Sequence, residues 1–380
     1  MKVESKLPWV GTTIFTVMSA LANEYGAINL SQGFPNFDCP ERLKFLVNEY
    51  MQRGLNQYAP MPGVPALRQQ IASKIENLYN APVNPDMEIT ITAGATQALF
   101  CAIAAFVKPG DEVILIEPAY DSYRPSIEVN GGVAVAYELA APDFRVDWEA
   151  LKKLVNRRTR MIIVNNPHNP TGKVFSKEDL LNLQKIAVEN DLLVLSDEVY
   201  EHLVFDGRQH ESVLAYPELF ARSLVTFSFG KTFHNTGWKI GYCVAPEPLM
   251  REFRKVHQFN VFAVNTPMQY AIADFLENPK EYLHLPDFYQ MKRDYFFAYM
   301  RESRFRAVGC EGTYFQLFDY SDISDLPDFD FVKKLITDHG VAAIPISVFY
   351  SSGRNERTIR LCFAKTEETL RQAGERLRAI

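Results

Sequence analysis

Hydrophobic residues along this chain fall into short continuous runs that alternate with stretches of helical spacing. Short apolar runs rich in Ile, Val, Leu and Phe are typical of strands buried inside a sheet. Between them, Leu67, Ile71, Ile75 and Leu78 follow the spacing of one helix face, and 98–107 reads as a buried helix. The strand-like runs are 88–92, 112–116, 133–139, 161–165, 192–196, 224–229 and 240–245. This alternation predicts an α/β fold with a mostly parallel sheet wrapped by helices.

The order of predicted helices and strands changes in the last third of the chain. A long helical region begins near Glu247, and from about Phe288 the sequence reads as helix, strands and helix. The strands of this part include 312–318 and 357–363. A chain of 380 residues is long enough for a large domain with a smaller one. We therefore expect a second, smaller α/β unit near the C-terminus.

Charge and composition exclude several classes of partner. The net charge is −6 with both signs interspersed, which argues against nucleic acid or an anionic membrane. No apolar run is long enough for a membrane span, and 1–8 lacks the apolar core of a signal peptide. The five cysteines are scattered, as expected for reduced thiols in a cytoplasmic protein. The seven histidines form no ligand-like cluster, so we expect no metal site.

One lysine has a context that suits chemistry. Lys231 follows the apolar run 224–229 within Ser228-Phe-Gly-Lys-Thr. Partial desolvation at the end of a buried strand lowers the pKa of an amine and makes it a competent Schiff-base nucleophile. Such an amine could hold an aldehyde cofactor. The alternative is a solvated surface lysine.

Two loops that follow strands offer hydrogen-bond donors. Gly94, Ala95 and Thr96 lie in a turn that opens the helix 98–107, and a helix N-terminus binds phosphate well. The alternative is a glycine present for steric reasons. Asn169 lies between prolines in Asn165-Asn-Pro-His-Asn-Pro-Thr-Gly, which would fix its amide as a donor. The alternative is an ordinary turn.

A carboxylate and a phenol follow the run 192–196. Asp197 ends this run and Tyr200 comes three residues later. An acid here could cap the next element. It also stands at the edge where open α/β sheets bind their ligands.

In this order, the four segments resemble the fold-type I aminotransferases that use pyridoxal 5′-phosphate. The resemblance runs from Asn29-Leu-Ser-Gln-Gly-Phe-Pro to Arg357-Thr-Ile-Arg-Leu-Cys-Phe-Ala-Lys, which is nearly the whole chain. Within that superfamily the chain is most similar to the kynurenine aminotransferase and glutamine transaminase K branch, which includes bacterial methionine aminotransferases. The closer match is carried by 56–60, 232–246 and 341–349.

The resemblance implies a domain organisation. It predicts a large cofactor-binding domain at 46–287, built on a mostly parallel seven-stranded sheet wrapped by helices. It predicts a smaller α/β domain formed by 26–45 and 288–380, and an N-terminal arm at 1–25. It also implies a homodimer whose two active sites are shared between the subunits.

The resemblance assigns most candidate residues to the cofactor. Lys231 would carry pyridoxal phosphate and move the substrate proton, while Asp197 would keep the ring nitrogen protonated. Asn169 and Tyr200 would donate to the phenolic oxygen. The remaining contacts are the phosphate ligands Gly94, Ala95, Thr96, Ser228 and Lys239, the stacking ring of Tyr120, and Tyr58 from the neighbouring subunit. Lys239 stands where many relatives have arginine, so it keeps the charge without bidentate geometry.

Further residues are assigned to the substrate. Arg360 would hold the α-carboxylate, helped by Gly33 and Asn169. The side-chain pocket would be apolar, and Lys280 is the single Lys or Arg between Val256 and Met291, which disfavours a dicarboxylate. We therefore expect neutral amino donors, with methionine favoured and phenylalanine, tyrosine, leucine, glutamine and kynurenine accepted. The apolar walls would be Phe15 or Ile14, Phe349, and Phe262 from across the dimer, with Ala263 replacing a histidine of some relatives.

The predicted reaction moves an α-amino group to a 2-oxo acid by a ping-pong mechanism. The alternatives are cysteine S-conjugate β-elimination and kynurenine transamination on the same scaffold. A non-enzymatic ligand-sensing domain is disfavoured, because Lys231 is present and the chain has no helix-turn-helix extension or basic patch.

Overall fold

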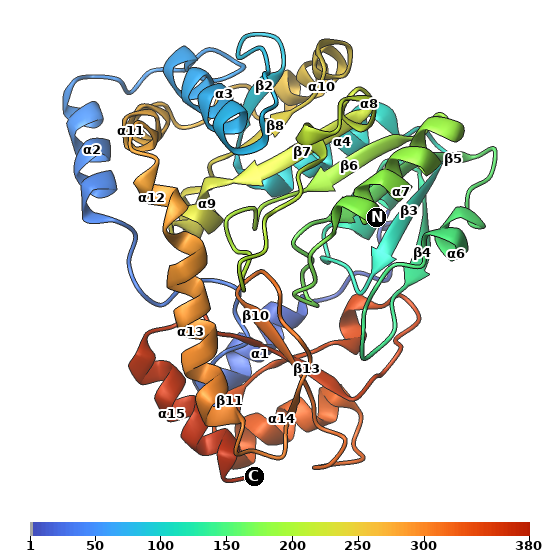
Figure 1. Ribbon diagram of the computed structural model, residues 1–380, viewed down its shortest axis with the longest axis vertical. Coiled ribbons are helices and arrows are strands. Elements are labelled where there is room, and N and C mark those ends of the chain that lie inside the picture. Colours follow the sequence, from blue (N-terminus) through green and yellow to red (C-terminus); the bar gives the residue numbers. More distant parts are fainter. Residues whose placement is uncertain (1–2) are drawn as a thin grey trace.

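The computed structural model describes residues 3–380 as two layered units with the chain crossing between them (Figure 1). Met1 and Lys2 lie outside the described residues. They belong to the expected N-terminal arm and to the segment 1–8, in which we expect no signal peptide. No helix within residues 3–380 is long and apolar enough to cross a lipid bilayer.

The larger unit is built on a seven-stranded sheet with the order β2-β8-β7-β6-β5-β3-β4. All strands except β8 run parallel, because β8 pairs antiparallel with both β2 and β7. The α/β prediction of a mostly parallel seven-stranded sheet is confirmed, and the strand ends differ from the predicted ones by at most two residues. The strands are β2 (Ile89–Thr92), β3 (Glu112–Glu117), β4 (Val133–Glu138), β5 (Thr159–Asn165), β6 (Leu193–Asp197), β7 (Ser223–Ser228) and β8 (Gly241–Val244).

Successive side chains of the central strands enter two different cores. Val113 and Leu115 lie in the core beneath α4, while Ile114 and Ile116 belong to the core on the opposite face. Because a strand points alternate side chains to opposite faces, covering both faces requires an uninterrupted apolar run. The helices of this unit are α3 (Pro65–Tyr79), α4 (Gly94–Phe106), α5 (Tyr123–Val129), α6 (Trp148–Lys152), α7 (Lys177–Glu189), α8 (Pro217–Phe220), α9 (Phe229–Thr232), α10 (Glu247–Asn260), α11 (Thr266–Leu276) and α12 (Lys280–Leu283).

The smaller unit occupies the lower part of Figure 1 and is reached through the long helix α13 (Leu285–Met300). It has an antiparallel sheet of order β12-β13-β10-β9 and a separate parallel pair, β1 with β11. The strands are β1 (Ile28–Asn29), β9 (Arg306–Ala307), β10 (Phe315–Asp319), β11 (Val341–Ala342), β12 (Ile344–Pro345) and β13 (Thr358–Cys362). Its other helices are α1 (Ile14–Glu24), α14 (Asp328–His339) and α15 (Glu367–Arg378).

The two N-terminal helices pack on different units. Helix α1 lies within the predicted arm, yet it contacts α14 and β11 and buries Met18 and Ala22. Helix α2 (Glu41–Gln52) begins within the segment expected in the small domain, yet it packs along α11. Helix α1 therefore packs on elements of the smaller unit, and α2 packs on a helix of the larger unit.

Candidate active site

The two units enclose a cavity of about 230 Å³ at the carboxyl ends of the parallel strands. Open α/β sheets bind ligands at this edge. Loops after β5, β6 and β7 and the start of α4 form one side, while 32–33, Phe315 and Arg360 form the other. Thirteen candidate residues line the cavity: Phe15, Gly33, Gly94, Ala95, Thr96, Tyr120, Asn169, Asp197, Tyr200, Ser228, Lys231, Lys239 and Arg360.

Lys231 projects from the short helix α9, directly after β7. Its Nζ donates to the Gly33 carbonyl at 3.0 Å and to the Tyr314 hydroxyl at 2.8 Å. Burial lowers the pKa of the amine to about 8, and the charges of Arg360 and Lys239 act in the same direction. A substantial neutral fraction at neutral to mildly alkaline pH makes this amine a nucleophile and a base.

Asp197 is the last residue of β6 and is buried. The Tyr123 hydroxyl donates to its Oδ2 at 2.7 Å, and none of the ion pairs among residues 3–380 involves it. Burial raises the pKa of the carboxyl to about 6, against the effect of the Tyr123 hydrogen bond. A cationic N–H group brought into the cavity would find in Asp197 a desolvated carboxylate.

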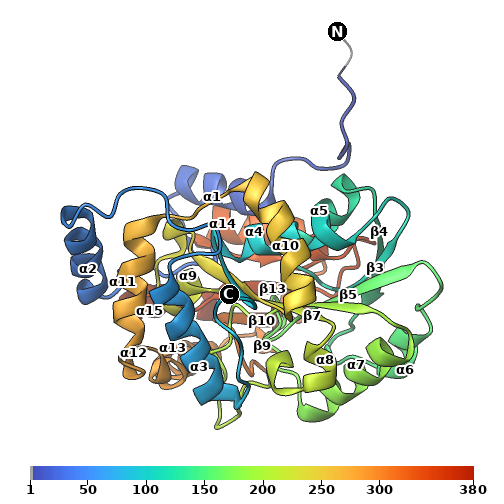
Figure 2. The ribbon, with the colours of Figure 1, turned by 90° about the horizontal axis from the view of Figure 1, so that it is seen from above.

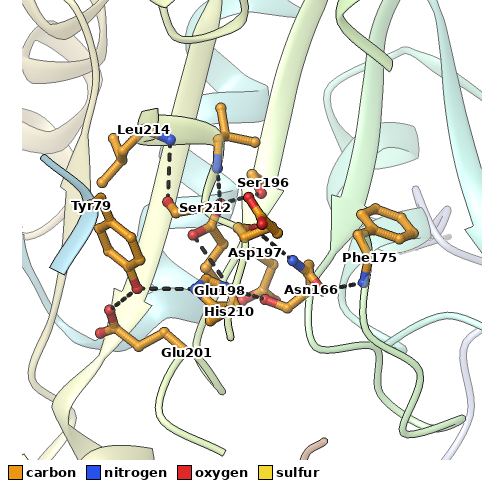
Figure 3. A network of polar contacts seen from close by, with 12 residues as sticks. Tyr79, Asn166, Phe175, Ser196, Asp197, Glu198, Glu201, His210, Ser212 and Leu214 are labelled. Atoms are coloured by element: carbon orange, nitrogen blue, oxygen red, sulfur yellow. Dashed lines mark hydrogen bonds and ion pairs between the residues drawn. The ribbon is translucent and has the colours of Figure 1, made fainter. Parts of the chain in front are cut away.

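A buried polar network behind the cavity fixes the end of β6 (Figure 3). The Asp197 carbonyl accepts from the Asn166 backbone at 3.0 Å and from the Asn165 amide at 2.8 Å. The Asn166 carbonyl in turn lies 3.1 Å from His210 Nε2, and His210 Nδ1 lies 3.0 Å from the Tyr79 hydroxyl. Two buried hydrogen bonds to one carbonyl restrict the backbone at Asp197 to one arrangement.

Two acids of this network have pKa values shifted in opposite directions. Burial raises the pKa of Glu198 to about 8, although Ser196 and the Val213 N–H donate to its carboxyl. Glu201 forms a buried ion pair with Lys74. Lys74 lowers the pKa of Glu201 to about 2, despite the opposing effect of burial.

The start of α4 forms a concave cradle with β7 and β8. Gly94 has a φ of +75°, and a Cβ added there would lie 3.3 Å from Lys239 Nζ. A Cβ at Gly241 would lie 2.8 Å from the Ala95 nitrogen, so only glycine lets β8 approach this closely. The unpaired N–H groups of α4, with Ser228 and Lys239 beside them in the cavity wall, suit a phosphate-sized anion.

Arg360 approaches the cavity from β13 and is 1% exposed. Its Nη1 donates to Asn169 Oδ1 at 2.8 Å, and its Nη2 donates to the Ser31 carbonyl at 3.2 Å. The guanidinium lies 3.8 Å from the centre of the Phe315 ring, and its buried Nε has no partner within residues 3–380. Burial lowers the pKa of this group to about 10, which leaves it charged at neutral pH. A carboxylate is a suitable partner for such a cation.

Four candidate residues do not line the cavity of the single chain, and one of them, Ile14, packs partly buried against the core. The buried ring of Phe349 lies behind Phe15, with ring centres 6.0 Å apart, and 5.4 Å from the Arg360 guanidinium. Tyr58 is 83% exposed and Phe262 is 45% exposed, and their rings meet edge to face at 5.4 Å. This pair therefore faces away from the chain that carries it.

The structure brings eight further residues to the site that the sequence did not single out: Gln32, Leu99, Tyr123, Asn165, Val199, Thr236, Tyr314 and Phe315. Tyr123 follows Tyr120 at helical spacing, Tyr314 directly precedes β10 and Phe315 opens it, so local pattern alone favours core packing for all three. Their proximity to Asp197, Lys231 and Arg360 arises from contacts between distant segments.

Residues 25–377 match the family described as aminotransferase class I and II. The chain belongs to this family. The aminotransferase is 52% identical to a methionine aminotransferase of Escherichia coli over 99% of this chain and 98% of that protein. It is 35% identical to kynurenine–oxoglutarate transaminase 1 of Mus musculus, covering 97% of this chain and 94% of that one. A solved Escherichia coli structure, described as having a methionine aminotransferase function, superposes with a TM-score of 0.98 at 52% identity and full coverage of both chains.

Proposed function

We propose that this aminotransferase uses pyridoxal 5′-phosphate and that the cavity residues hold the cofactor. The observation that carries the proposal is one cavity lined by an amine of lowered pKa, a buried carboxylate outside the ion pairs and an anion cradle. These three groups match the aldehyde, the pyridine nitrogen and the phosphate of the cofactor. When bound, pyridoxal phosphate supplies a carbonyl carbon for covalent attachment and a ring that withdraws electrons.

Each polar group then has a separate task. Lys231 Nζ anchors the cofactor and, once free, removes the proton from Cα of the substrate. Asp197 keeps the ring nitrogen protonated. Asn169 and Tyr200 donate to the phenolic oxygen, since Arg360 already occupies the Asn169 amide oxygen and leaves its NH₂ group for this role. The phosphate is held by the α4 N–H groups at 94–96, Ser228 and Lys239, while Tyr120 stacks on the ring.

Arg360 is proposed to bind the α-carboxylate of the amino donor, together with the Gly33 N–H and Asn169. Its guanidinium is already oriented by Asn169, Ser31 and the Phe315 ring. Because little side-chain freedom remains to be lost on binding, most of the interaction contributes to affinity.

The proposed amino donors are neutral, with methionine favoured. Three cations line the cavity in the described chain, Lys231, Lys239 and Arg360, and each already has a task. No cavity cation is left for a second carboxylate, while Phe15, with Phe349 packed against it, offers apolar surface beside Arg360. The relative at 52% identity is named a methionine aminotransferase. A flexible thioether gains from burial and from sulfur–aromatic contact in such surroundings.

Kynurenine transamination and S-conjugate β-elimination are the second candidates. The relative from Mus musculus is named a kynurenine–oxoglutarate transaminase, which favours the first of these. The ratio of pyruvate plus ammonia to transaminated product, formed from a cysteine S-conjugate, separates elimination from amino transfer.

The proposed assembly is a cytoplasmic homodimer with shared active sites. The exposed Tyr58–Phe262 pair suits contact with a second subunit's cavity. Figure 2 shows the N-terminal end of the described chain extending away from the body, where it could reach a partner. All five cysteines are free and buried, which suits a reducing compartment.

Borohydride reduction of the loaded enzyme followed by peptide mapping tests the cofactor assignment. The pyridoxyl group should be found on Lys231, and Lys231→Ala should lose turnover because anchor and base are removed together. Lys292→Ala, at a half-buried lysine outside the cavity, is the matched control and should keep wild-type labelling. Pyridoxyl label on another lysine would refute the assignment.

A further inference from the structure

The Lys231 amine is held by two acceptors that come from distant parts of the chain. One acceptor is the carbonyl of Gly33, a residue that follows β1. The other is the hydroxyl of Tyr314, the residue directly before β10. The Tyr314 hydroxyl also donates to the Gly33 carbonyl at 2.5 Å. The three groups therefore form a closed hydrogen-bonded triangle between the larger unit, which carries Lys231, and the smaller one.

Hydrogen-bond roles within the triangle are fixed by chemistry. A carbonyl oxygen only accepts, so Gly33 accepts from both Lys231 and Tyr314. The single Tyr314 proton is committed to Gly33, and its oxygen then accepts from the lysine. Burial raises the pKa of Tyr314 well above its ordinary value, so the hydroxyl stays protonated at working pH.

The Tyr314 ring has little freedom to move. It is fully buried and contacts Tyr200 edge to face at 5.3 Å, Phe315 at 4.9 Å and Tyr289 at 5.8 Å. A hydroxyl fixed in this way defines one location for the lysine amine.

We propose that Tyr314 is a positioning residue for Lys231, which together with the Gly33 carbonyl holds the amine whenever it is not attached to the cofactor. This inference rests on the proposed role of Lys231. Between its covalent task and its task as a base, the flexible lysine side chain could adopt many rotamers. Holding the amine in one place reduces the conformational entropy that the side chain must lose to reach the substrate proton.

Gly33 connects the position of the Lys231 amine to that of the substrate. Its carbonyl receives the lysine, while its N–H is proposed to contact the substrate carboxylate beside Arg360. A Cβ at Gly33 would lie 2.7 Å from the Phe315 ring, the same ring that supports the Arg360 guanidinium. The positions of the amine and of the carboxylate are thus set by one short segment.

The ionisation of Lys231 reports directly on its hydrogen bond with the Tyr314 hydroxyl. The charged and titratable groups acting on the amine are Asp197, Arg360, Lys239 and Cys362, and the rings of Tyr200 and Tyr314 lie within 6 Å of it. The Tyr314 oxygen accepts from the ammonium form, so removing that oxygen should favour the neutral amine. The other charges stay in place, and the change isolates the hydroxyl.

The test is Tyr314→Phe, with Tyr289→Phe as the matched control. Tyr289 is equally buried, but its hydroxyl bonds to His234 instead of Lys231. The pH dependence of Lys231 acetylation by acetic anhydride, read by mass spectrometry on the full-length protein freed of cofactor, gives the acid dissociation constant of the amine. Tyr314→Phe should raise this constant about three- to tenfold, as expected for one lost hydrogen bond. It should also lower kcat about tenfold, while KM for the amino donor stays within about twofold of wild type.

Tyr289→Phe should leave the acid dissociation constant of Lys231, kcat and KM at wild-type values. The inference is overturned if Tyr314→Phe leaves Lys231 ionisation unchanged, even with a fall in kcat, or if Tyr289→Phe reproduces both effects. Failure of the cofactor assignment looks different, because the wild-type protein would then carry no pyridoxyl group on Lys231 after borohydride reduction. The acetylation measurement remains valid in that case.

Discussion

At the scale of single residues, burial is the main influence on the pKa of Asp197. The folded protein holds the pKa of this carboxyl at about 6, above its ordinary value of 3.8. A carboxyl with a raised folded pKa binds its proton more tightly when folded, so its contribution favours folding most at low pH. That contribution falls as the pH rises from about 4 to 6 and stays reduced above this window.

The neutral variant Asp197→Asn does not titrate and should escape this loss. Relative to wild type, its free energy of unfolding without cofactor should increase between pH 4 and 7 by on the order of 3 kcal/mol, at 1.36 kcal/mol per pKa unit. Urea unfolding at several pH values measures this difference. Asp206→Asn should change with the opposite sign and only below about pH 4, because Arg293 lowers the pKa of Asp206 in the folded state below its ordinary value of 3.8. A pH-independent difference for Asp197→Asn would contradict the argument.

At the scale of elements, the anion cradle depends on how closely β8 approaches the first turn of α4. A Cβ at Gly241 would lie 2.6 Å from the Phe227 carbonyl and 2.8 Å from the Ala95 nitrogen. Gly241→Ala should therefore shift the start of α4, destabilise the protein by about 1–3 kcal/mol and weaken cofactor binding. Gly237→Ala is the control, since an added Cβ there meets nothing within 4 Å. Thermal unfolding and absorbance titration with pyridoxal phosphate measure both effects, and equal behaviour of the two variants would refute the packing argument.

At the scale of the whole molecule, the exposed Tyr58 and Phe262 bear on assembly. If they complete the site of a partner subunit, the active species is a two-fold homodimer. Sedimentation equilibrium at assay concentrations should give the dimer mass, and Tyr58→Ala should weaken cofactor retention. A fully active monomer would rule out shared sites.

The same interface should set substrate preference. Phe262→Arg would bring a cation towards the partner's pocket, so the ratio of kcat/KM for methionine over aspartate should fall about tenfold or more. Phe259→Arg, at an exposed position of α10, is the control. An unchanged methionine preference in Phe262→Arg, or a higher kcat/KM for aspartate than for methionine in the wild-type enzyme, would contradict an apolar substrate pocket completed by Phe262.

The sequence by itself determined the sheet, because strands buried on both faces need continuous apolar runs, and these are visible without any knowledge of contacts. It also marked the residues at the strand ends and loops, including Asp197 and Lys231, since their order and local context are properties of the chain alone. The helices α1 and α2 were harder to assign, because their amphipathic faces do not specify which unit they cover.

The tertiary structure alone determined which of the site residues contact one another. Tyr123 reaches Asp197 across 74 positions of sequence, and Tyr314 reaches Lys231 across 83. Local pattern cannot distinguish either tyrosine from an ordinary core aromatic. The lowered pKa of Lys231 and the raised pKa of Asp197 likewise come mainly from burial by segments far along the chain. Desolvation depends on everything that surrounds a group in space, so it is set only when the fold closes around the site.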